Sequence, residues 1–397
     1  MQKCDARLRS VNETRVRRSI FVLPLTAAAG RQITDDERGH QRVAKENILV
    51  LFGGVSTEHE VSCMSAASVI ENIDREKFEV LSVGIAKDGR WLLYSGSIED
   101  MRACRWEEDA ANVPAFLVPD RSVGGIIVLG EEGSSVLPVD CVFPVLHGAN
   151  GEDGTMQGLL EIAGIPYVGS GVCASAAAMD KTVTKVICDA AGIPQAAFML
   201  VHRAELTTGM EAVITGAERR IGAYPMFVKP ASSGSSVGVS KASDRAALER
   251  ALLVAAQYDD KVLIEEFIDG QELETAVLGN AAPIAPVVGE IAPCREFYSY
   301  EAKYIDGKSE LFIPARISQD DARTLSDLAV RAYRALGCRG LARADFFRRR
   351  SDGKIIFNEI NTLPGFTSIS MYPKLMEAAG IPYKELITRL IALAQEV

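Results

Sequence analysis

The fold of this chain is decided by the stretch Lys354-Ile355-Ile356-Phe357-Asn358-Glu359-Ile360-Asn361-Thr362-Leu363-Pro364-Gly365. It has the pattern of a strand: apolar residues, polar side chains toward the end, and a Pro-Gly stop. Because side chains alternate along a strand, Glu359 and Asn361 are expected on one face, about 7 Å apart. A second strand is predicted upstream, at 341–347, joined to the first through Ser351-Asp352-Gly353. The two strands predict a β-hairpin that carries polar side chains.

The register of this hairpin follows from its loop. A three-residue loop with Gly353 in the left-handed conformation is a common hairpin closure. The pairs that it predicts are Arg350 with Lys354, Asp345 with Glu359, and Arg343 with Asn361. The last two pairs then share one face of the hairpin, whereas a slip of one residue would scatter them.

The shared face would gather oxygen atoms from Asp345, Glu359 and Asn361. Such donors suit Mg²⁺ that bridges nucleotide phosphates, and Arg343 beside them suits a negatively charged transition state. The alternative is a solvated hairpin with scattered charges, which is common for acidic strand residues. The apolar residues of the same strand favour burial, and a buried acidic cluster needs a cation.

Length and composition indicate an enzyme of several domains. A chain of 397 residues is too long for one core, so two or three domains are expected. A hydrophobic content of 48% with 24% charged residues is ordinary for a soluble enzyme. The net charge of −10, without a basic run after the first forty residues, argues against nucleic acid as a partner. No apolar run approaches the length of a membrane span.

The cysteines and histidines predict neither disulfides nor a metal site. No Cys-x-x-Cys pair occurs, and several cysteines lie in apolar stretches, so reduced core residues of a cytoplasmic protein are expected. The histidines lack zinc-ligand spacing. The positions are Cys4, Cys63, Cys104, Cys141, Cys173, Cys188, Cys294 and Cys338, with His40, His59, His147 and His202.

Residues 1–45 differ from the rest of the chain. They are rich in arginine and contain one short apolar patch, Ile20–Leu25, which Pro24 interrupts. The apolar part is short and the basic region long for a signal peptide, although secretion and an organelle transit peptide stay open. A disordered extension is the preferred prediction.

The folded part is expected to begin with a buried strand at Asn47–Phe52, followed by Gly53-Gly54. Thr57 and Glu60 have capping-box spacing, which predicts a helix start with Glu58 in its first turn. Such a corner of an α/β sheet faces a ligand. Glu58 is therefore either a substrate ligand or an acid that stabilises the helix dipole. The dinucleotide fingerprint G-x-G-x-x-G is absent, which argues against a nicotinamide enzyme.

Two further strands are predicted with αβ spacing, at Phe78–Ile85 and Val139–Leu146. The second runs into His147-Gly148-Ala149-Asn150-Gly151-Glu152-Asp153-Gly154, and a helix is expected from Thr155. Three glycines at the carboxyl end of a strand let a ligand approach closely. His147 is either a catalytic candidate or an ordinary loop histidine.

Three helices are expected to end on a left-handed Gly with Pro beyond it. The endings are Ala163-Gly164-Ile165-Pro166, Ala191-Gly192-Ile193-Pro194 and Ala379-Gly380-Ile381-Pro382. A domain boundary is predicted near Gly169-Ser170-Gly171.

A phosphate-binding lid is predicted after the strand Tyr224–Lys229. The segment 230–238 is built of small residues whose N–H groups can surround phosphates, while Lys229 supplies positive charge. A flexible linker is the alternative. A linker seldom separates two strands, and Val237–Val239 is interpreted as a strand, so the lid is favoured.

Two later segments complete a nucleotide site. The strand Val262–Ile268, with acids at its end, suits a hinge that binds a base and a ribose, and an ordinary edge strand is the alternative. The aromatic and charged segment Phe297–Tyr304 predicts a loop that closes over the site, with Lys303 reaching phosphate.

Together these motifs resemble those of the D-alanine–D-alanine ligase family, which are ATP-grasp enzymes. The likeness runs from about Asn47 to the C-terminus, and the first forty-odd residues have no counterpart. The motifs are Gly-Gly-x-Ser-x-Glu-His-x-Val-Ser (53–62), His-Gly-x-x-Gly-Glu-Asp-Gly (147–154), Lys-Pro-x-x-x-Gly-Ser-Ser-Val-Gly (229–238), Glu-Ala-Lys-Tyr (301–304) and Asn-Glu-Ile-Asn-Thr-x-Pro-Gly (358–365).

The resemblance implies an α/β (α+β ATP-grasp) fold with three domains. Residues 1–45 would be the extension, 46–169 the N-terminal substrate domain, 170–265 the central ATP-grasp domain, and 266–397 the C-terminal ATP-grasp domain with the metal site. It also implies a cytoplasmic homodimer that acts on ATP and D-alanine in peptidoglycan precursor synthesis.

The resemblance further implies a role for each matching residue. ATP would be bound by Lys181, Lys229, Ser236, Glu265, Phe267, Ile268, Glu272 and Lys303. Two Mg²⁺ or Mn²⁺ ions would be held by Asp345, Glu359 and Asn361. The first substrate's ammonium would meet Glu58, supported by Ser235 and Tyr304, with His147 nearby. The oxyanion would be stabilised by Arg343 and the Gly365 N–H, and the second carboxylate by Ser370 and Met371.

The implied reaction joins two D-alanines. The first carboxylate attacks the γ-phosphate and becomes an acyl phosphate, which the amine of the second D-alanine then attacks. Relatives that use D-lactate typically have His where Tyr304 stands, and relatives that use D-serine often have Arg before Tyr-Pro, where this chain has Met371-Tyr372-Pro373. Both positions favour D-alanine. The alternative from another class is a non-catalytic nucleotide-binding relative, which the intact Asp345 and Glu359 argue against.

Overall fold

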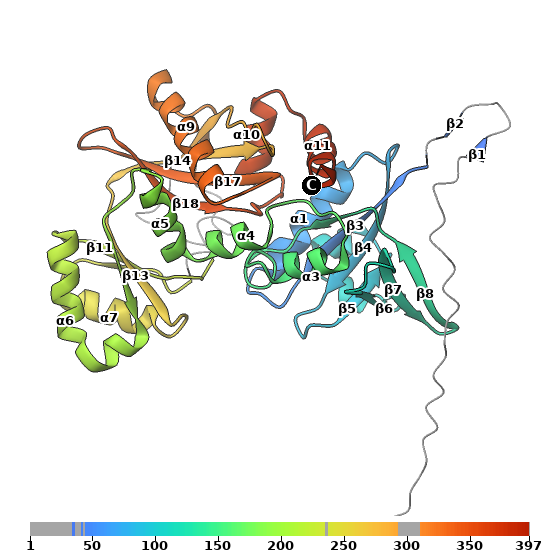
Figure 1. The fold of residues 1–397 in the computed structure, drawn as a ribbon, viewed down its shortest axis with the longest axis horizontal. Helices are drawn as coiled ribbons and strands as arrows, with labels where there is room; N and C mark the ends of the chain where they lie inside the picture. The colour runs from blue at the N-terminus through green and yellow to red at the C-terminus, as the bar shows by residue number, and fades with distance from the viewer. Residues whose placement is uncertain (1–33, 36–40, 43, 235–236, 293–309, 397) are drawn as a thin grey trace, which may run out of the picture. The chain divides into compact units, whose positions relative to one another are not determined.

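The computed structural model describes residues 34–35, 41–42, 44–234, 237–292 and 310–396. The chain forms two compact units, Met1–Ala44 and Lys45–Val397. In the first unit the described residues pair as two short antiparallel strands, β1 (Thr34–Asp35) and β2 (Gln41–Arg42). Most of the predicted N-terminal extension lies outside the described residues. The elements of the second unit are labelled in Figure 1.

The first part of the second unit is a seven-stranded sheet with the order β8-β7-β6-β5-β4-β3-β9. The apolar strand β3 pairs in parallel with β4 and β9, and the other neighbours pair antiparallel. The strands are β3 (Glu46–Gly53), β4 (Phe78–Ile85), β5 (Trp91–Tyr94), β6 (Val113–Leu117), β7 (Gly125–Gly130), β8 (Gly133–Pro138) and β9 (Cys141–Pro144). The predicted strands at 47–52 and 78–85 are confirmed, and the strand predicted at 139–146 is shorter, at Cys141–Pro144.

The connection from β4 to β9 differs from the expected αβ alternation, because it is mainly an antiparallel meander. Its first turn lies at Asp88-Gly89, where Gly89 has a φ of 88° and its N–H donates to the Ala86 carbonyl over 2.9 Å. Asp-Gly between apolar runs is a strong hairpin signal that the prediction did not use. The helical elements of this part are α1 (His59–Asn72), α2 (Ile98–Arg102), η1 (Trp106–Glu108) and α3 (Thr155–Ala163).

The start of α1 corrects the predicted capping box. The N-cap residue is Glu58, and its side chain makes no capping hydrogen bond. Thr57 and Glu60 therefore do not stand at the two positions of a capping box, and the Glu60 carboxylate pairs with Lys87 instead. The corner is held instead by Ser62, whose hydroxyl accepts from the Gly53 N–H over 2.8 Å and donates to the Val145 carbonyl.

A four-stranded antiparallel sheet follows, with the order β10-β13-β11-β12. Its strands are β10 (Phe198–His202), β11 (Met226–Pro230), β12 (Ser240–Ala242) and β13 (Lys261–Glu266), covered by α6 (Arg203–Ile221) and α7 (Arg245–Ala255). The predicted strand at Val237–Val239 is wrong, and β12 begins at Ser240. Gly238 has a φ of 74°, which turns the chain there.

The third sheet is antiparallel, with the order β16-β15-β14-β17-β18. Its strands are β14 (Gly270–Leu278), β15 (Val288–Ala292), β16 (Glu310–Phe312), β17 (Leu341–Arg349) and β18 (Ile355–Asn361). The helices α9 (Gln319–Ala335) and α10 (Met371–Ala378) pack against it. The other helices among the described residues are α4 (Val172–Met179), α5 (Lys181–Ala190) and α11 (Tyr383–Gln395).

The hairpin β17–β18 confirms the predicted pairing at the site and corrects the predicted loop. Asp345 lies opposite Glu359, and Arg343 lies opposite Asn361. Near the turn, however, Arg349 faces Lys354, because its N–H donates to the Lys354 carbonyl over 2.9 Å. The loop therefore has one residue more than predicted. A β-bulge at Asn358 inserts one unpaired residue and restores the register at the acidic positions.

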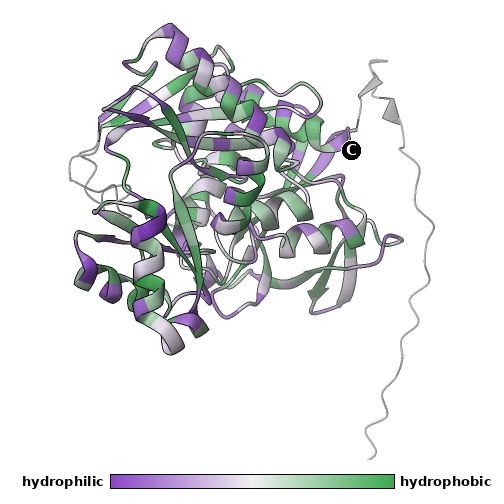
Figure 2. Cartoon of the chain, turned by 60° about the vertical axis from the view of Figure 1, so that its left-hand side comes forward, coloured by the Kyte–Doolittle hydropathy of each residue, from purple (hydrophilic) through white to green (hydrophobic). Residues whose placement is uncertain are grey.

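The C-terminal helix α11 packs against α1 and β9. Ile48, Phe143 and Leu390 are consequently members of one buried cluster that joins the first sheet to the end of the chain. Figure 2 shows hydrophobic and hydrophilic residues mixed along strands as well as helices, as expected for elements that bury one face. None of the described helices combines the length and apolarity that a membrane crossing requires.

The three predicted helix endings are confirmed. The glycines at these ends have φ values of 68° at Gly164, 65° at Gly192 and 82° at Gly380. A left-handed glycine lets the chain leave each helix without a Cβ clash. The domain boundaries at 169 and 265 stay predictions.

Candidate active site

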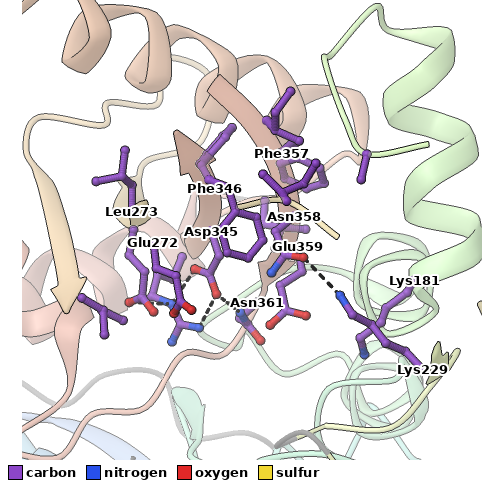
Figure 3. A pocket seen from close by; sticks show the side chains of 18 of the residues that line it. Lys181, Lys229, Glu272, Leu273, Asp345, Phe346, Phe357, Asn358, Glu359 and Asn361 are labelled. Atoms are coloured by element: carbon purple, nitrogen blue, oxygen red, sulfur yellow. Dashed lines mark hydrogen bonds and ion pairs between the residues drawn. The ribbon is translucent and has the colours of Figure 1, made fainter. Parts of the chain in front are cut away.

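A cavity of about 850 Å³ lies among the second and third sheets and two loops of the first part. Its lining comes from β11, β13, β14, β17 and β18, and from the segments that hold Glu58 and His147. A volume of this size suits a nucleotide together with a small substrate. Figure 3 shows labelled side chains of this cavity, with Asp345 and Asn361 on the far side from Lys181 and Lys229 and with Glu359 between them.

The acidic side of the cavity is organised by Arg343. Its guanidinium donates to both carboxylate oxygens of Asp345 over 2.7 and 2.6 Å, and it lies 3.0 Å from Glu274. Burial opposes the charge of Arg343, but the carboxylates of Asp345 and Glu274 outweigh it and raise the pKa of Arg343 well above its usual value. The arginine is therefore permanently charged. Sequence reasoning missed Glu274, which is 6% exposed.

The oxygen donors on this side fit a divalent cation. Asp345, Glu359 and Asn361 all line the cavity. The Asn361 amide nitrogen donates toward Asp345 over 3.4 Å, which leaves the amide oxygen as the group that a cation can use. Carboxylate and amide oxygens are the ligands that Mg²⁺ and Mn²⁺ prefer.

The basic side of the cavity is held together by Glu265. Its carboxylate pairs with Lys185 and lies 2.6 Å from the Lys229 ammonium. Burial alone would raise the pKa of Glu265, but the charges of Lys185 and Lys229 lower it to about 2. The side chains of Glu265 and Lys185 are only 4% and 2% exposed, so this ion pair is buried. Lys229 also donates to Asn358 over 3.3 Å.

Lys181 completes the basic side of the cavity. Its ammonium donates to the Ser233 carbonyl over 2.7 Å, and burial lowers its pKa. An anionic ligand beside it would offset this burial. Lys185 lies one turn further along α5 and was missed, although its spacing from Lys181 places both on one helix face.

Aromatic and apolar groups form a slot at the end of β13. Phe267 and Ile268 line the cavity, and the Phe227 ring centroid lies 5.8 Å from that of Phe267. The Lys241 ammonium lies 4.4 Å from the Phe267 ring centroid. Glu272 lines the same region. This arrangement suits a planar base with a polar group beside it.

The far end of the cavity is formed by Glu58 and the two glycines that it approaches. A Cβ at Gly148 would lie 2.6 Å from the Glu58 Oε2 atom, and a Cβ at Gly234 would lie 2.9 Å from the same atom. A Cβ at either position would therefore displace the Glu58 carboxylate, and the φ of 73° at Gly148 also favours glycine there. The carboxylate of Glu58 lies between the loop after β9 and the loop after β11.

His147 joins the loop after β9 to the segment after β18. One ring nitrogen lies 3.1 Å from the Leu363 carbonyl and the other lies 3.1 Å from the Ser65 hydroxyl. Burial lowers the pKa of His147, which favours the neutral ring. Both nitrogens are already engaged, so His147 positions the two segments.

Glu152 is a cavity residue that sequence reasoning did not single out. Its carboxylate accepts from the Gly148 N–H over 2.7 Å. Burial and the neighbouring charge of Glu58 raise the pKa of Glu152 to about 8. The group is thus protonated over much of the neutral range.

Replacing Glu152 with Gln is expected to flatten the pH dependence of stability. A raised pKa stabilises the folded state fully below about pH 4.5, and this contribution is lost as the pH rises toward 8. The slope is at most about 1.4 kcal/mol per pH unit. Urea unfolding between about pH 5 and pH 8 measures it. Glu132→Gln, at an exposed position, is the control, and an unchanged slope in Glu152→Gln would contradict the raised pKa.

Of the remaining predicted residues, some lie at or near the cavity and the others lie outside the described part of the chain. Gly365 lines the cavity, and Ser370 adjoins it, because a Cβ at Gly365 would lie 2.9 Å from the Ser370 hydroxyl. Met371 is the first residue of α10, with Ser370 as the N-cap. The predicted residues Ser235, Ser236, Lys303 and Tyr304 lie outside the described residues.

Comparison with known protein families shows which family this chain belongs to. A model of the D-ala D-ala ligase N-terminus matches residues 47–170, and a model of the D-ala D-ala ligase C-terminus matches residues 187–392. The chain belongs to the D-alanine–D-alanine ligase family. It is therefore an ATP-dependent ligase, and its family uses a divalent metal ion and small-molecule substrates.

Individual members of the family are similar over most of their length. The D-alanine–D-alanine ligase of Caldicellulosiruptor bescii is 51% identical over 89% of this chain and 96% of its own. That of Acetivibrio thermocellus is 51% identical over 88% and 96%. Residues 1–45 precede both family models.

Solved structures of the family confirm the predicted ATP-grasp fold. The VanG D-Ala:D-Ser ligase of Enterococcus faecalis matches with a TM-score of 0.79 and 40% identity, over 88% of this chain and all of that chain. The D-alanine–D-alanine ligase of Coxiella burnetii matches with a TM-score of 0.74 and 34% identity, over 89% and 96%.

Proposed function

We propose that this chain joins two D-alanines into D-alanyl-D-alanine at the expense of ATP, for peptidoglycan precursor synthesis. The observation that carries the proposal is one cavity with three chemically different ends: the oxygen cluster at Asp345, the lysines around Glu265, and the carboxylate of Glu58. Each end matches one part of the reaction. Relatives named D-alanine–D-alanine ligase support the substrate.

In this proposal the nucleotide binds between the second and third sheets. The base lies in the slot of Phe267 and Ile268, and Glu272 meets the ribose. Lys181 and Lys229 face the phosphates, together with Ser236 and Lys303. Because Glu265 fixes Lys185 and Lys229 beforehand, little reorganisation is needed when the phosphates arrive.

The oxygen cluster serves the transferred phosphoryl group. Two Mg²⁺ or Mn²⁺ ions, held by Asp345, Glu359 and Asn361, would neutralise charge on the nucleotide phosphates. Arg343 is charged independently of any metal and lies beside the same oxygens. It stabilises the oxyanion that forms when the second amine attacks the acyl phosphate, together with the Gly365 N–H.

The first D-alanine binds at the Glu58 end. Its ammonium pairs with the Glu58 carboxylate, supported by Ser235 and Tyr304, and its carboxylate then points toward the phosphoryl group. His147 holds the loop after β9 against the segment after β18. A closed cavity protects the acyl phosphate from hydrolysis.

Replacing Gly148 with Ala is expected to raise the KM for the first D-alanine by about tenfold or more, because the added Cβ would overlap the Glu58 carboxylate. The KM for ATP should change little. Gly337→Ala is a matched control, since Gly337 has a φ of 72° against 73° at Gly148 and no atom within 4 Å of an added Cβ. Steady-state kinetics of both variants test this. Equal KM values in the two variants would contradict the placement of Glu58.

The second substrate binds near the start of α10. The N–H of Met371 and the hydroxyl of Ser370 hold its carboxylate, as the amino end of a helix favours an anion. A D-serine substrate is the alternative, because VanG is named a D-Ala:D-Ser ligase. Met371 occupies the position before Tyr372-Pro373 and offers a serine hydroxyl only the weakly accepting sulfur of a thioether, which favours D-alanine.

The experiment that tests the function is phosphate release from Mg-ATP. D-alanine, D-serine, D-lactate and L-alanine are offered alone and in pairs, and the products are identified by mass. Release with D-alanine alone, with D-alanyl-D-alanine as product, supports the proposal. Release only with a D-alanine and D-serine pair, or a D-alanine and D-lactate pair, would keep the mechanism and replace the second substrate. No release with any of them would overturn the substrate assignment.

The ligase is further proposed to act as a homodimer in the cytoplasm. Light scattering of the purified chain measures the oligomeric state, and a monomer under assay conditions would refute the dimer. Fractionation of cells locates the native protein.

A further inference from the structure

Three side chains that the proposed reaction does not use meet beside the start of α1. His59, Cys63 and Cys104 each offer one ligand atom, and these atoms lie within 4.8 Å of one another. The sulfur atoms of Cys63 and Cys104 are 3.2 Å apart. His59 and Cys63 are four residues apart on α1, which places them on the same helix face. None of the three lines the cavity described above.

We propose that His59, Cys63 and Cys104 form a zinc-binding site, separate from the ATP site. One imidazole nitrogen and two sulfurs form a donor set that binds zinc in preference to magnesium. The site goes beyond the ligase reaction and does not depend on it.

The distance between the sulfurs favours a metal over a disulfide. Two Zn–S bonds of about 2.3 Å at a tetrahedral centre put the sulfurs about 3.8 Å apart, so the observed 3.2 Å must open by about 0.6 Å. A disulfide requires about 2.05 Å, so the same pair must close by about 1.2 Å. The metal site therefore requires the smaller change in the distance between the two sulfurs.

The ring of His59 is oriented as a metal ligand. Its Nδ1 atom lies 2.7 Å from the Gly54 carbonyl. Because a carbonyl only accepts, Nδ1 donates to it, and Nε2 is the ring atom that faces the Cys104 side chain and that a metal would bind. The ring also stacks on Trp106, with centroids 6.3 Å apart and planes 20° apart. Hydrogen bonding of the other ring nitrogen to a backbone carbonyl is the usual support of a metal-bound histidine.

Cys104 occupies a backbone position that usually takes glycine. It follows the C-cap of α2 with a φ of 55°. A left-handed residue after a helix is usually Gly because it has no Cβ, so a cysteine there points to a need for its side chain. Cys63 is buried and Cys104 is partly exposed. The exposed side leaves a fourth coordination position for water.

Trp106 gives a separate indication that a ligand binds beside Cys63. It is fully buried, and its indole N–H makes no regular hydrogen bond, although it lies close enough to the Cys63 sulfur to affect that thiol. The hydrogen bond with Cys104 and burial raise the pKa of the Cys63 thiol, and Trp106 acts in the opposite direction. A zinc-bound thiolate at Cys63 would give this N–H the anionic acceptor that a neutral thiol does not provide.

A metal at this site would join the first turn of α1 to the chain after α2. His59 directly follows Glu58, so the ion would also fix the backbone next to the proposed substrate ligand. The site is therefore a structural clamp, and its thermodynamic effect is a metal-dependent rise in stability.

The test uses the full chain, purified with a reductant and freed of metal by a chelator. Cobalt(II) is titrated first, because thiolate-bound tetrahedral cobalt gives a sulfur-to-metal charge-transfer band and intense visible bands. Cobalt bound to the oxygens of Asp345 and Glu359 gives neither. Zinc is then added in competition with a chromophoric chelator. One cobalt ion per chain with both bands, displaced by zinc, is the expected result.

Four variants locate the site. Cys104→Ser and His59→Gln should abolish the charge-transfer band or weaken zinc binding by at least about 100-fold. Cys173→Ser, at an exposed cysteine, and Cys188→Ser, at a buried one, should leave both unchanged. Circular dichroism checks that each variant is folded. Zinc should also slow alkylation of Cys104 by about tenfold or more, with Cys173 as the internal reference.

Three outcomes would overturn the zinc site. One is the lack of thiolate-bound cobalt in the folded wild-type chain. Another is a band that survives in the folded Cys104→Ser variant. The last is a reduced protein that binds no zinc and that forms a Cys63–Cys104 disulfide after mild oxidation by peroxide. Peptide mass identifies this disulfide. In that case the two thiols lose two electrons and two protons to the peroxide, and the pair is a thiol switch.

Discussion

Replacing Glu359 with Gln is expected to lower kcat by at least about 10³-fold while leaving the fold intact. The amide has the same shape as the carboxylate but lacks its charge, so it binds a divalent cation beside the transferred phosphate much more weakly. The position is specific because Glu359 lies opposite Asp345 in the hairpin. Steady-state turnover at saturating ATP and D-alanine, with a titration of Mg²⁺, measures the loss.

The control is Glu249→Gln, which makes the same chemical change at an exposed position of α7. Its kcat should match that of the wild type. Thermal unfolding of both variants separates a catalytic loss from a folding defect. A near-normal kcat for Glu359→Gln at all Mg²⁺ concentrations would remove this residue from the metal site. A normal kcat that is reached only at higher Mg²⁺ concentrations would indicate that Glu359 is a supporting ligand.

Replacing Glu265 with Gln is expected to cost about 3–5 kcal/mol of stability, because it leaves the buried ammonium of Lys185 and the partly buried ammonium of Lys229 without a carboxylate. The side chains of Lys185 and Glu265 are 2% and 4% exposed, so solvent cannot screen the charges. Urea unfolding measures the loss. The double variant Lys185→Met, Glu265→Gln should lose less than the sum of the two single variants, because it removes one of the unpaired charges.

The ion pairs of Glu265 also make the stability of the chain depend on pH. Because the pKa of Glu265 is about 2 in the folded chain against an ordinary value of 4.5, its stabilisation is complete above about pH 4.5 and is lost as the pH falls toward 2. Glu265→Gln should remove this part of the acid sensitivity. The control is Glu79→Gln, which breaks a surface pair with Lys45 and should change little. Equal stability losses in the two variants would refute the buried network.

The sequence by itself determined the strands that carry the site. Alternation and the Pro-Gly stop placed Glu359 and Asn361 on one face, and the hairpin brought Asp345 and Arg343 beside them. These features depend on neighbours in the chain, and local backbone geometry decides them. The pairing was right although the loop was wrong, because the bulge at Asn358 compensated for the longer turn.

Only the tertiary structure decided which distant groups meet. Glu265 was expected beside a base, and it also anchors Lys185 and Lys229, which come from α5 and β11. Glu274 and Glu152 have no local pattern, since their roles follow from burial beside Arg343 and Glu58.

The clearest case is the cluster at α1. The spacing of cysteines and histidines predicted no metal site, yet Cys63 and Cys104 have their sulfurs 3.2 Å apart. The four-residue spacing of His59 and Cys63 was a usable signal, but the third ligand comes from beyond α2. Motifs along a chain report what the backbone places locally. Contacts between segments depend on packing, because the hydrophobic effect that drives it is not directional and does not by itself specify partners.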